Sequence, residues 1–387
     1  MRQGWEVKKL GEVCEIQGGS TPKRTESLYW ENGTYPWFTI EDIREQGHVI
    51  TDTKQKVTKI AWDKLRVFPK DTILLCCTAS LGECAITKIS LTSNQQFNGL
   101  TIKDRDSLNP MYLMHFCCSL KNKLYALSGK ATIDFVSAEK VRQIPIPLPP
   151  LPEQEKIVAE LDCLSGIIEK KKQQLKELDA LAQSIFYEMF GDPVENEKGW
   201  EVKKLGEEFE ISSGGTPDTK NPLYWESGDI SWIGSNMCHD SIIYQNDGKY
   251  ITLEGLQHSS AKIFQSGCVI VALVGATIGK TALLRFSTTT NQNVAGINVP
   301  SNKNYTSEYI FYLIQNLYEL FLSIGNGKFK MANLSFIRSL PLPITPLSLQ
   351  HSFASKVEAI EKQKELIKQS IAETELLFNS RMQYYFG

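Results

Sequence analysis

The stretch that comes nearest to a catalytic motif is VALVGATIGKTALL, residues 271–284. Its Gly-Lys-Thr behind an apolar run suggests a loop that binds nucleotide phosphates, which requires the pattern G-x-x-x-x-G-K-[ST]. Gly275 precedes Gly279 by four positions, one short of that pattern. The residues that follow are β-branched and rich in turn formers, whereas a phosphate-binding loop leads into a helix. We therefore predict a strand, a turn and a second strand here, without nucleotide binding.

The residues that could bind a metal show no ligand spacing either. The chain has nine cysteines and five histidines, and no C-x-x-C pair is present. The histidines are scattered and stand near no cysteine at ligand spacing. We expect no metal and no cofactor, and we interpret the cysteines as small buried hydrophobic residues in a reducing cytoplasm.

The composition is that of a globular protein of two or three domains. The chain has 387 residues, of which 42% are hydrophobic, and a net charge of −2. It contains no run of 18 apolar residues and begins without the apolar stretch of a signal peptide. We expect a cytoplasmic protein without a membrane segment. A charge this close to neutral neither requires nor excludes a nucleic-acid partner.

The decisive feature is a tandem repeat with a period of about 195 residues, far longer than the period of a solenoid. GWEVKKLGE occurs at Gly4–Glu12 and again at Gly199–Glu207. Further matching segments, in the same order in both copies, are GSTP with GGTP, LYWENG with LYWESG, Trp37 with Trp232, NQQF with NQNV, and YEMFG with QYYFG. ASLGECAI matches ATIGKTAL as well, so the first copy has Glu83 where the apparent phosphate loop of the second copy has Lys280. Each copy must therefore be a complete domain with an extension.

The first 145 or so residues of each copy predict a strand-rich α+β domain. Short apolar runs rich in β-branched residues are flanked by Gly, Asn and Ser, which is typical of short strands. Helices are expected at Pro110–Leu127, at its counterpart Ser307–Ser323, and near Ser137–Arg142. We predict two such domains in tandem, at residues 1–150 and 192–347, each followed by a long helix, at 151–191 and 348–387.

Each long helix carries a heptad pattern after a proline-rich break, IPIPLPPLPEQ in the first copy. In Glu153–Phe190 apolar residues recur at two positions of every heptad, with Lys171 intruding. A helix with such a stripe must bury it, and its counterpart is the obvious partner. We expect an antiparallel coiled coil with pseudo-twofold symmetry, and the alternative is that each helix packs separately on its own domain. The predicted pairing residues are Ile157, Leu161, Leu164, Ile168, Leu175, Leu178, Phe353, Val357, Ile360, Ile367, Ile371 and Phe378.

Two similar domains held apart by paired helices suit a ligand with two sites at a fixed separation, of which DNA is the common example. The copies share a framework but differ in the segments between, as two readers of different sequences would. Neutral drift could produce the same divergence.

Taken together and in order, the repeated motifs resemble the specificity subunit of type I restriction-modification systems. The resemblance rests on W-E-x-K-K-L-G-E, G-G-x-T-P with Y-W-E-x-G, N-Q, and I-P-x-P-x-P-x-x-E-Q before a helix that ends in M-F-G, and it covers nearly the whole chain. The second copy departs from it where LSLQ stands in place of LPEQ.

The resemblance implies a recognition protein without catalysis of its own. Each domain would read one half of a bipartite double-stranded DNA sequence. The paired helices would set the spacer and dock two methyltransferase subunits, and restriction subunits would join that core. In agreement, the sequence has no methyl-donor loop and no D/N-P-P-Y/F/W tetrapeptide.

Candidate DNA-contacting residues are polar or cationic side chains in expected loops, because Lys and Arg bind phosphates and polar side chains read base edges. They are Thr21, Lys23, Arg24, Lys54, Lys56, Lys59 and Lys130 in the first copy, and Thr216, Lys220, Lys249, Lys280, Lys328 and Lys330 in the second. For any one lysine, a solvated surface charge is the alternative. Trp30 and Trp225 are expected in the core rather than as stacking platforms.

Three other functions stay open at this point. One is a two-domain scaffold that binds only proteins, and another is a nucleotide-binding enzyme built on the Gly-Lys-Thr stretch. The third is the specificity subunit of a related system in which methyltransferase and nuclease are fused.

Overall fold

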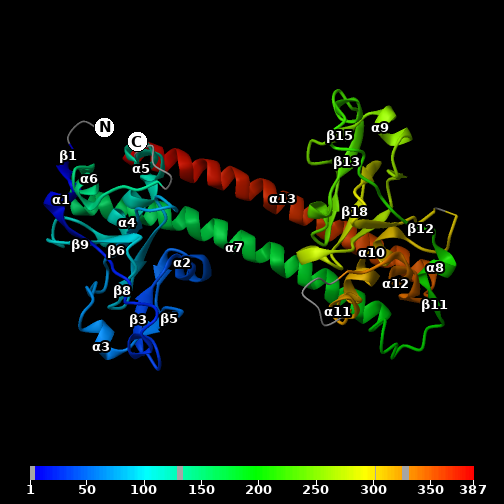
Figure 1. Ribbon diagram of the computed structural model, residues 1–387, viewed down its shortest axis with the longest axis horizontal. Helices are drawn as coiled ribbons and strands as arrows, with labels where there is room; N and C mark the ends of the chain where they lie inside the picture. The colour runs from blue at the N-terminus through cyan, green and yellow to red at the C-terminus, as the bar shows by residue number, and fades with distance from the viewer. Residues whose placement is uncertain (1–4, 129–133, 301, 325–330) are drawn as a thin grey trace. The chain divides into compact units, whose positions relative to one another are not determined.

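The computed structural model of the chain describes residues 5–128, 134–300, 302–324 and 331–387. The chain divides into two compact units, Met1–Lys172 with Gln369–Gly387, and Gln173–Lys368. Each unit contains one strand-rich domain and half of each long helix (Figure 1). Among the helices of the described residues, none is both long and apolar enough to cross a membrane.

The domain of unit 1 is built on a five-stranded sheet in the order β2-β9-β6-β7-β4. A three-stranded sheet, β5-β3-β8, and a pair, β1-β10, complete it. The strands are β1 (Glu6–Lys9), β2 (Cys14–Gly18), β3 (Tyr35–Phe38), β4 (Val49–Ile50), β5 (Gln55–Val57), β6 (Ile73–Cys76), β7 (Cys84–Thr87), β8 (Thr92–Ser93), β9 (Phe97–Ile102) and β10 (Pro145–Leu148). The helices are α1 (Leu10–Val13), α2 (Ile40–Gln46), α3 (Lys59–Trp62), α4 (Pro110–Ser119), α5 (Lys121–Leu127) and α6 (Ala138–Arg142).

The domain of unit 2 repeats this topology, except that its second sheet has four strands, in the order β15-β13-β19-β16. Its five-stranded sheet has the order β12-β20-β17-β18-β14, and each strand corresponds to one in the sheet of unit 1. The strands are β11 (Val202–Lys204), β12 (Ile211–Ser213), β13 (Ile230–Ile233), β14 (Ser241–Ile243), β15 (Tyr250–Ile251), β16 (Ile263–Phe264), β17 (Val269–Ala272), β18 (Thr281–Leu284), β19 (Thr288–Thr290), β20 (Val294–Ile297) and β21 (Pro341–Pro343). The helices are α8 (Leu205–Glu208), α9 (Leu253–Gln257), α10 (Ser307–Asn316), α11 (Tyr318–Leu322) and α12 (Leu334–Ser339). The predicted α+β class is confirmed.

The central strand of each domain is buried on both faces. In β6, Ile73 and Leu75 pack into the core under α4, whereas Leu74 and Cys76 pack into a second core on the other face of the sheet. In β17 the same alternation repeats, because side chains of a strand point to opposite faces in turn. The continuous apolar runs in the sequence thus mark strands covered on both sides.

The helix predicted at Pro110–Leu127 is two helices rather than one. It breaks at Leu120, whose ψ of −4° ends α4 before α5 begins at the next residue. The counterpart in unit 2 breaks in the same way at Leu317. Neither break has a Pro or Gly to mark it in the sequence, so the periodic pattern alone predicted a single helix. The helix predicted near Ser137–Arg142 is confirmed as α6.

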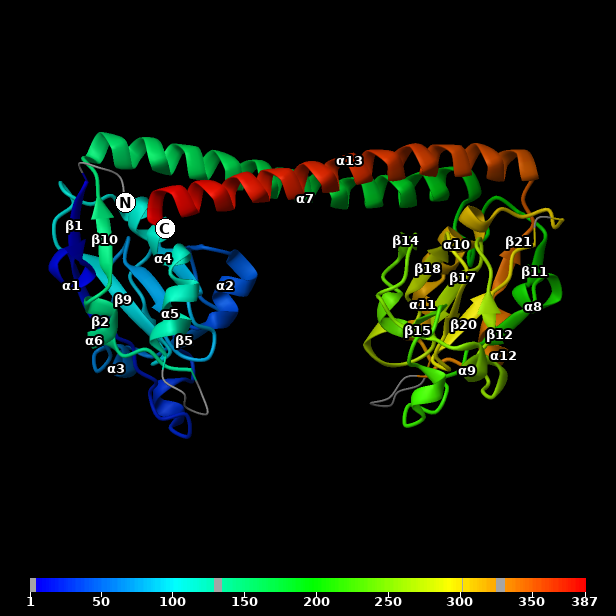
Figure 2. The ribbon, with the colours of Figure 1, turned by 90° about the horizontal axis from the view of Figure 1, so that it is seen from above.

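The two long helices are α7 (Leu151–Phe190) and α13 (Leu347–Phe386). A buried glutamine fixes the start of each to its domain. Gln154 accepts a hydrogen bond from the Asn109 backbone N–H and donates to the carbonyls of Ser107 and Pro149. Gln350 makes the equivalent three bonds in unit 2. Figure 2 shows the strand pairs that lead into the helices, β1 with β10 and β11 with β21.

The helices run antiparallel to each other within each unit, as predicted. In unit 1, Glu160 pairs with Arg381, and Lys171 contacts Ser370. Residue numbers that rise along α7 thus meet residue numbers that fall along α13. In unit 2, Lys364 forms an ion pair with Asp179 at 2.7 Å, and Phe186 meets Phe353 further along α7. The intruding Lys171 is accommodated by donating to the hydroxyls of Ser370 and Thr374.

The apolar stripe of each helix faces a domain core at its ends. Of the predicted pairing residues, the buried ones are Ile157, Leu161, Ile168, Phe353, Val357, Ile360 and Ile371, and the half-buried ones are Leu164, Leu175, Leu178, Ile367 and Phe378. Ile157 and Leu161 belong to the core of unit 1, and Phe353 and Val357 to the core of unit 2. The apolar stripe therefore packs on a domain core at the ends of each helix, and elsewhere it faces the other helix. Both interpretations of the stripe thus apply, to different parts of one helix.

The repeated aromatic end of each helix packs in the domain that precedes the other helix. Phe190, at the end of α7, packs against Tyr309 and Phe353 in unit 2. Phe386, at the end of α13, packs against Tyr112 and Phe116 in unit 1. The repeated motif that ends in Phe-Gly thus closes the core of the other copy's domain.

Candidate nucleic-acid interface

The three candidate lysines near β5 each lie beside a carboxylate. The pairs are Lys54 with Glu45 (2.8 Å), Lys56 with Asp52 (3.2 Å) and Lys59 with Asp63. The hydrogen bonds to Glu45 and Asp63 raise the pKa values of Lys54 and Lys59. Because phosphates would compete with these carboxylates, the cluster offers DNA less positive charge than its lysines suggest.

Arg24 is the best oriented of the candidate cations. Its guanidinium lies over the rings of Trp30 and Trp37, 4.0 and 4.5 Å from their centroids, and Nη1 donates to Gln55 Oε1 at 2.8 Å. Stacking of this kind fixes the plane of the guanidinium while the side chain stays exposed. The neighbouring Lys23 pairs with Glu26 at 3.0 Å.

The Gly-Lys-Thr stretch forms the predicted strand, turn and strand. β17 and β18 pair antiparallel, with Val271 opposite Thr281, and Gly279 in the turn has a φ of 76°. Lys280 Nζ lies 2.6 Å from Asp240 Oδ2, so its charge is already partnered within the domain. The stretch leads into a strand and not a helix, which removes the structural basis for a phosphate-binding loop.

The remaining candidates of unit 2 are dispersed. Lys220 is exposed in the segment before the 3-10 turn Pro222–Tyr224. Lys249 lies 3.9 Å from Asp247, with its ammonium 5.9 Å from the ring centroid of Trp232. Lys130, Lys328 and Lys330 lie outside the described residues.

The two threonine candidates occupy matching sites. Thr21 Oγ1 donates to Gln95 Oε1 at 2.5 Å, and Thr216 Oγ1 donates to Gln292 Oε1 at 2.6 Å. Both glutamines are exposed. They belong to the repeated N-Q motif, yet the choice of candidates passed over them because only Lys, Arg and Thr were taken from the expected loops. The signal that could have found them is the recurrence of an exposed polar residue in both copies.

The tryptophans of both copies form matching edge-to-face pairs. The ring centroids of Trp30 and Trp37 are 5.0 Å apart, and those of Trp225 and Trp232 are 5.3 Å apart. Trp37 and Trp232 are buried, and their partners are half-buried. Trp37 Nε1 donates to the Ser20 carbonyl and Trp232 Nε1 to the Gly215 carbonyl. These tryptophans therefore pack under the Gly-x-Thr-Pro segments and hold them through hydrogen bonds to the backbone.

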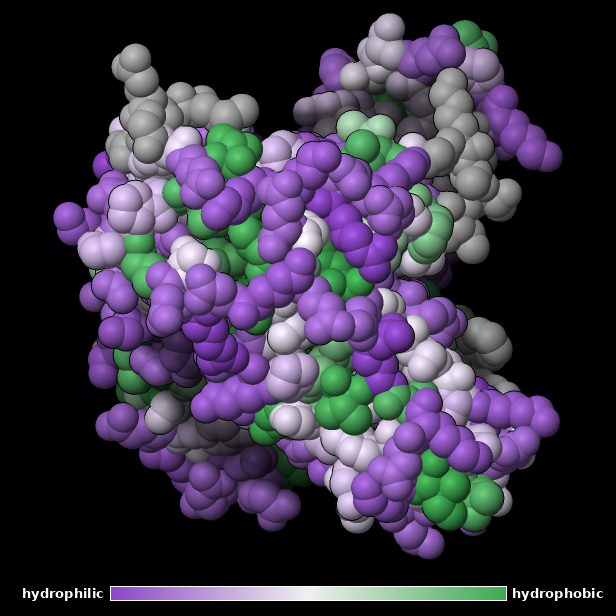
Figure 3. Space-filling view, turned by 90° about the vertical axis from the view of Figure 1, so that its left-hand side faces the viewer, coloured by the Kyte–Doolittle hydropathy of each residue, from purple (hydrophilic) through white to green (hydrophobic). Residues whose placement is uncertain are grey.

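The long helices carry large apolar side chains on their solvent side. Exposed ones in unit 1 are Ile167 (37%), Leu376 (72%) and Leu377 (47%), and those in unit 2 are Leu181 (46%) and Leu366 (66%). On the face of the molecule in Figure 3, hydrophilic residues predominate and apolar ones gather in small separate patches. Apolar side chains that stand singly are ordinary on a protein surface, whereas Leu376 and Leu377 are adjacent in the sequence.

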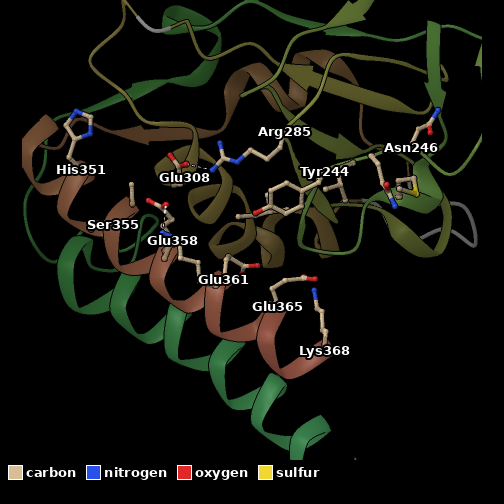
Figure 4. Close-up of a pocket in the computed structure, with 17 residues that line it drawn as sticks. Tyr244, Asn246, Arg285, Glu308, His351, Ser355, Glu358, Glu361, Glu365 and Lys368 are labelled. Carbon is tan, nitrogen blue, oxygen red and sulfur yellow. Dashed lines mark hydrogen bonds and ion pairs between the residues drawn. The ribbon is translucent and has the colours of Figure 1, made fainter. Parts of the chain in front are cut away.

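A groove of about 940 Å³ lies in unit 2 between the first half of α13 and the segment after β14. Figure 4 shows Glu358, Glu361 and Glu365 of α13 along one wall, with Tyr244 and Arg285 across from them. Arg285 is paired with Glu308 at 2.5 Å. Glu358 pairs with Lys362 at 3.1 Å and Glu361 with Lys364 at 2.6 Å, and Lys368 also lines the groove, so the groove carries charges of both signs.

The interpretation of the cysteines as small buried residues is wrong for the exposed Cys163 and for Cys84 and Cys118, which are bonded to each other. Cys84 and Cys118 form a disulfide, and a ring nitrogen of His48 and the two sulfurs all lie within 4.8 Å of one another. His48 Nδ1 also hydrogen-bonds to the Cys84 carbonyl at 2.8 Å. His48 and Cys84 are 36 positions apart in the sequence, and the sequence pattern did not predict their contact because it depends on β4 pairing with β7. Cys163 is exposed, and the remaining six cysteines are buried as expected.

The fold and these surfaces define a duplicated recognition protein, in which two domains of one topology present matching exposed polar sites. Comparison with known proteins gives the family. The model of the type I restriction modification DNA specificity domain matches twice, at residues 2–180 and 197–376. The chain therefore belongs to the family of type I restriction-modification specificity subunits, which are non-catalytic, and it carries two tandem recognition domains.

Individual relatives agree with this assignment. The specificity subunit of the type I restriction enzyme MjaIX of Methanocaldococcus jannaschii is 27% identical over 379 residues, which cover 92% of this chain and 86% of the relative. That of EcoprrI from Escherichia coli is 33% identical over 168 residues, 41% of this chain and 42% of the relative. Two solved structures share the fold. The S subunit from M. genitalium has a TM-score of 0.55 at 14% identity, covering 99% of this chain and 96% of that one. A chain from a study of complex assembly in the type I R-M system has a TM-score of 0.63 at 21% identity, covering 100% and 98%.

Proposed function

We propose that this chain recognises a bipartite sequence in double-stranded DNA, with one half read by each domain. The recognition domains would be residues 1–150 and 192–347, and the helices at 151–191 and 348–387 would set the spacer. The observation that carries the proposal is the double match to the specificity domain, in copies that share topology but differ in their exposed segments. Two identical readers would need no such divergence.

The helices would also dock two methyltransferase subunits, and restriction subunits would join through that core. The support is the set of exposed apolar side chains on α7 and α13, which occur in both units. A protein that works on DNA with these partners would reside in the cytoplasm. The DNA-contacting candidates that remain strongest are Arg24 and the matching Thr21 and Thr216.

A domain exchange tests the division of labour. Residues 196–347 are replaced by the corresponding segment of a relative, and the methylated sequence is determined by methylome sequencing of a host that also carries the methyltransferase. We expect a split motif with modified adenines on both strands, in which the exchange alters one half and leaves the other unchanged. A change in both halves, or an unsplit motif, would contradict the proposal.

A titration tests the role of the partners. Neither domain has a strong excess of Lys and Arg, and several candidate lysines are paired with carboxylates. We therefore expect the isolated chain to bind DNA weakly and the complex with methyltransferase to bind tightly, with a strong dependence on salt. Nanomolar specific binding by the isolated chain would refute this expectation, and binding without salt dependence in either form would favour a scaffold that binds only proteins.

A further inference from the structure

We propose that each domain holds the sugar-phosphate backbone of its half-site with three equivalent side chains. They are Thr21, Arg66 and Gln95 in unit 1 and Thr216, Lys262 and Gln292 in unit 2, so the threonine and glutamine are identical and the cation is Arg in one and Lys in the other. We call these two sets the shared polar trios. The inference rests on the proposed function and goes beyond it, because it separates residues that anchor DNA from residues that read its sequence. Arg66 and Lys262 were not among the candidates taken from the sequence.

The first observation is that the trios occupy equivalent positions. The ring of Phe68 packs directly over Gly99 of β9, and the ring of Phe264 packs in the same way over Gly296 of β20. Arg66 and Lys262 each precede the phenylalanine of their unit by two residues in the sequence. The Thr–Gln hydrogen bonds match to within 0.1 Å, at 2.5 and 2.6 Å. The equivalence thus holds in structure as well as in sequence order.

The second observation is that the backbone beneath each trio is held rigidly in the same way. Gly19 N–H donates to the Phe97 carbonyl, and Ser20 N–H donates to the Ser93 carbonyl. Gly214 and Gly215 make the equivalent bonds in unit 2. A Cβ at Gly19 would lie 2.2 Å from Ser93 Oγ, so only glycine permits this approach of the Gly-x-Thr-Pro segment to the turn that carries Gln95.

The third observation is that the cation of each trio lies at the same edge. Arg66 Nη1 donates to the Gly18 carbonyl at 2.7 Å, one residue before the Gly-x-Thr-Pro segment begins. In unit 2, Lys262 and Gln292 line one hollow of about 430 Å³, together with Ser213, Gly214 and Ser260. In unit 2 the trio thus brings one positive charge and one amide to a single small surface, which Glu210 and Arg338 also line.

The chemistry of the trio suits a phosphate. Because each glutamine oxygen accepts from its threonine, the amide is oriented with its two N–H donors available to a ligand. Across the residues that the structure describes, neither of these NH₂ groups has a protein partner. A cation and an N–H donor side by side bind the oxygens of a phosphodiester, which are acceptors only.

Exposure and divergence together indicate which part of DNA is bound. All four side chains of the two glutamines and two cations are exposed, so packing does not require them to be retained. The flanking exposed residues did diverge: Lys23 and Arg24 correspond to Asp218 and Thr219. Two half-sites differ in their bases but have the same backbone. Side chains common to both domains therefore fit the backbone, and those that differ fit the bases.

The experiment measures binding by the complex of this chain with its methyltransferase. The probes are a short duplex carrying the split sequence found by methylome sequencing and a matched duplex with both half-sites scrambled. Arg66→Ala and Lys262→Ala should each weaken binding to both duplexes by the same factor and reduce the slope of log K against log salt by about 1. Gln95→Ala and Gln292→Ala should weaken binding to both duplexes about 2- to 10-fold without altering the slope.

Two controls separate contact from folding and from general charge. Arg66→Lys keeps the charge and should restore the slope. Lys8→Ala removes a half-buried surface cation of β1 that pairs with Glu6 at 3.3 Å, and it should leave DNA binding unchanged. The proposal is overturned if Arg66→Ala changes the ratio of specific to scrambled binding, which would make Arg66 a base reader, or if affinity and slope stay at the wild-type values. A wild-type complex that does not distinguish the two duplexes would instead refute the proposed function, and the trios with it.

Discussion

Replacing Phe186 tests whether a helix of the first copy stabilises the domain of the second. Phe186 lies in α7 and is 1% exposed. Its ring centroid is 5.0 Å from that of Phe190, 5.7 Å from Phe353 and 5.9 Å from Tyr309. A Phe→Ala change at such a site removes buried area and leaves a cavity, and costs about 3–5 kcal/mol. The whole of this cost should fall on unit 2.

Hydrogen exchange read by mass spectrometry can assign the loss to one unit. Strand amides that exchange only when a unit opens should exchange faster by the factor that corresponds to the destabilisation, since each ~1.4 kcal/mol is a factor of ten. For Phe186→Ala we expect an acceleration on the order of 10²- to 10⁴-fold in β17 and β20, with β6 and β9 unchanged. Tyr187→Ala is the matched control, because Tyr187 is the next residue and is 44% exposed.

The reciprocal variant sits in the same helix. Leu161 is 0% exposed and belongs to the core of unit 1, so Leu161→Ala should accelerate exchange in β6 and β9 and spare β17 and β20. Its expected cost is about 2–5 kcal/mol. If either variant accelerates exchange equally in both domains, the two halves of α7 do not belong to separate cooperative units. If neither variant accelerates exchange in any of these strands, the helix ends do not contribute to the domain cores.

Three further outcomes follow from single contacts. Burial lowers the pKa of His115, nearby His48 lowers it further, and the hydrogen bond to Asp162 only partly opposes this, so His115 takes up a proton more readily in the unfolded chain. Unit 1 should therefore lose stability as the pH falls below about 6.5, with a lower urea midpoint at pH ~5.5 than at pH ~7.5. The variant His115→Asn should show no such difference. Lys364→Ala leaves the half-buried Glu361 without the ion-pair partner that lies 2.6 Å away, and it should destabilise unit 2 by about 2–3 kcal/mol in urea unfolding. The double variant Lys364→Leu with Glu361→Leu should recover most of this stability. If the single and double variants lose the same stability, the ion-pair argument is wrong. Gln154→Ala leaves the Asn109 N–H and two carbonyls unpaired in the protein interior, at a cost in stability of roughly 1–3 kcal/mol for each group that water cannot reach. The melting temperature should fall in this variant. It should stay unchanged in the control Gln173→Ala, because Gln173 is exposed.

The elements that could be predicted are those whose signal is local and periodic. The heptads of α7 predict a helix and the apolar runs of β6 and β17 predict strands, because the pattern of buried residues in each segment is characteristic of its secondary structure. The repeat predicted the domain organisation, because two copies of one sequence pattern should form two domains of the same fold, each followed by a long helix. The break at Leu120 has no local marker, and it escaped prediction for that reason.

The candidate site was harder to predict because its contacts are long-range. Whether a lysine is free depends on which carboxylate the fold brings near it, and the partner of Lys280 is Asp240, 40 residues away. The glutamine that meets Thr21 is 74 residues away, and that of Thr216 is 76 away. Residue type could therefore nominate candidates, but only the strand pairing that joins β8 and β9 to the Gly-x-Thr-Pro segment could show which of them act together.

The duplication within one chain permits an inference that a single domain would not. A residue that is shared and buried, such as Gln154 with its counterpart Gln350, is explained by the hydrogen bonds it makes in both cores. A residue that is exposed and different, such as Arg24 against Thr219, is free to follow the half-site that its own domain reads. The residues that neither packing nor sequence specificity explains are those both exposed and shared. Gln95 and Gln292 are of this kind, so they should act on what the two half-sites have in common, which is the DNA backbone.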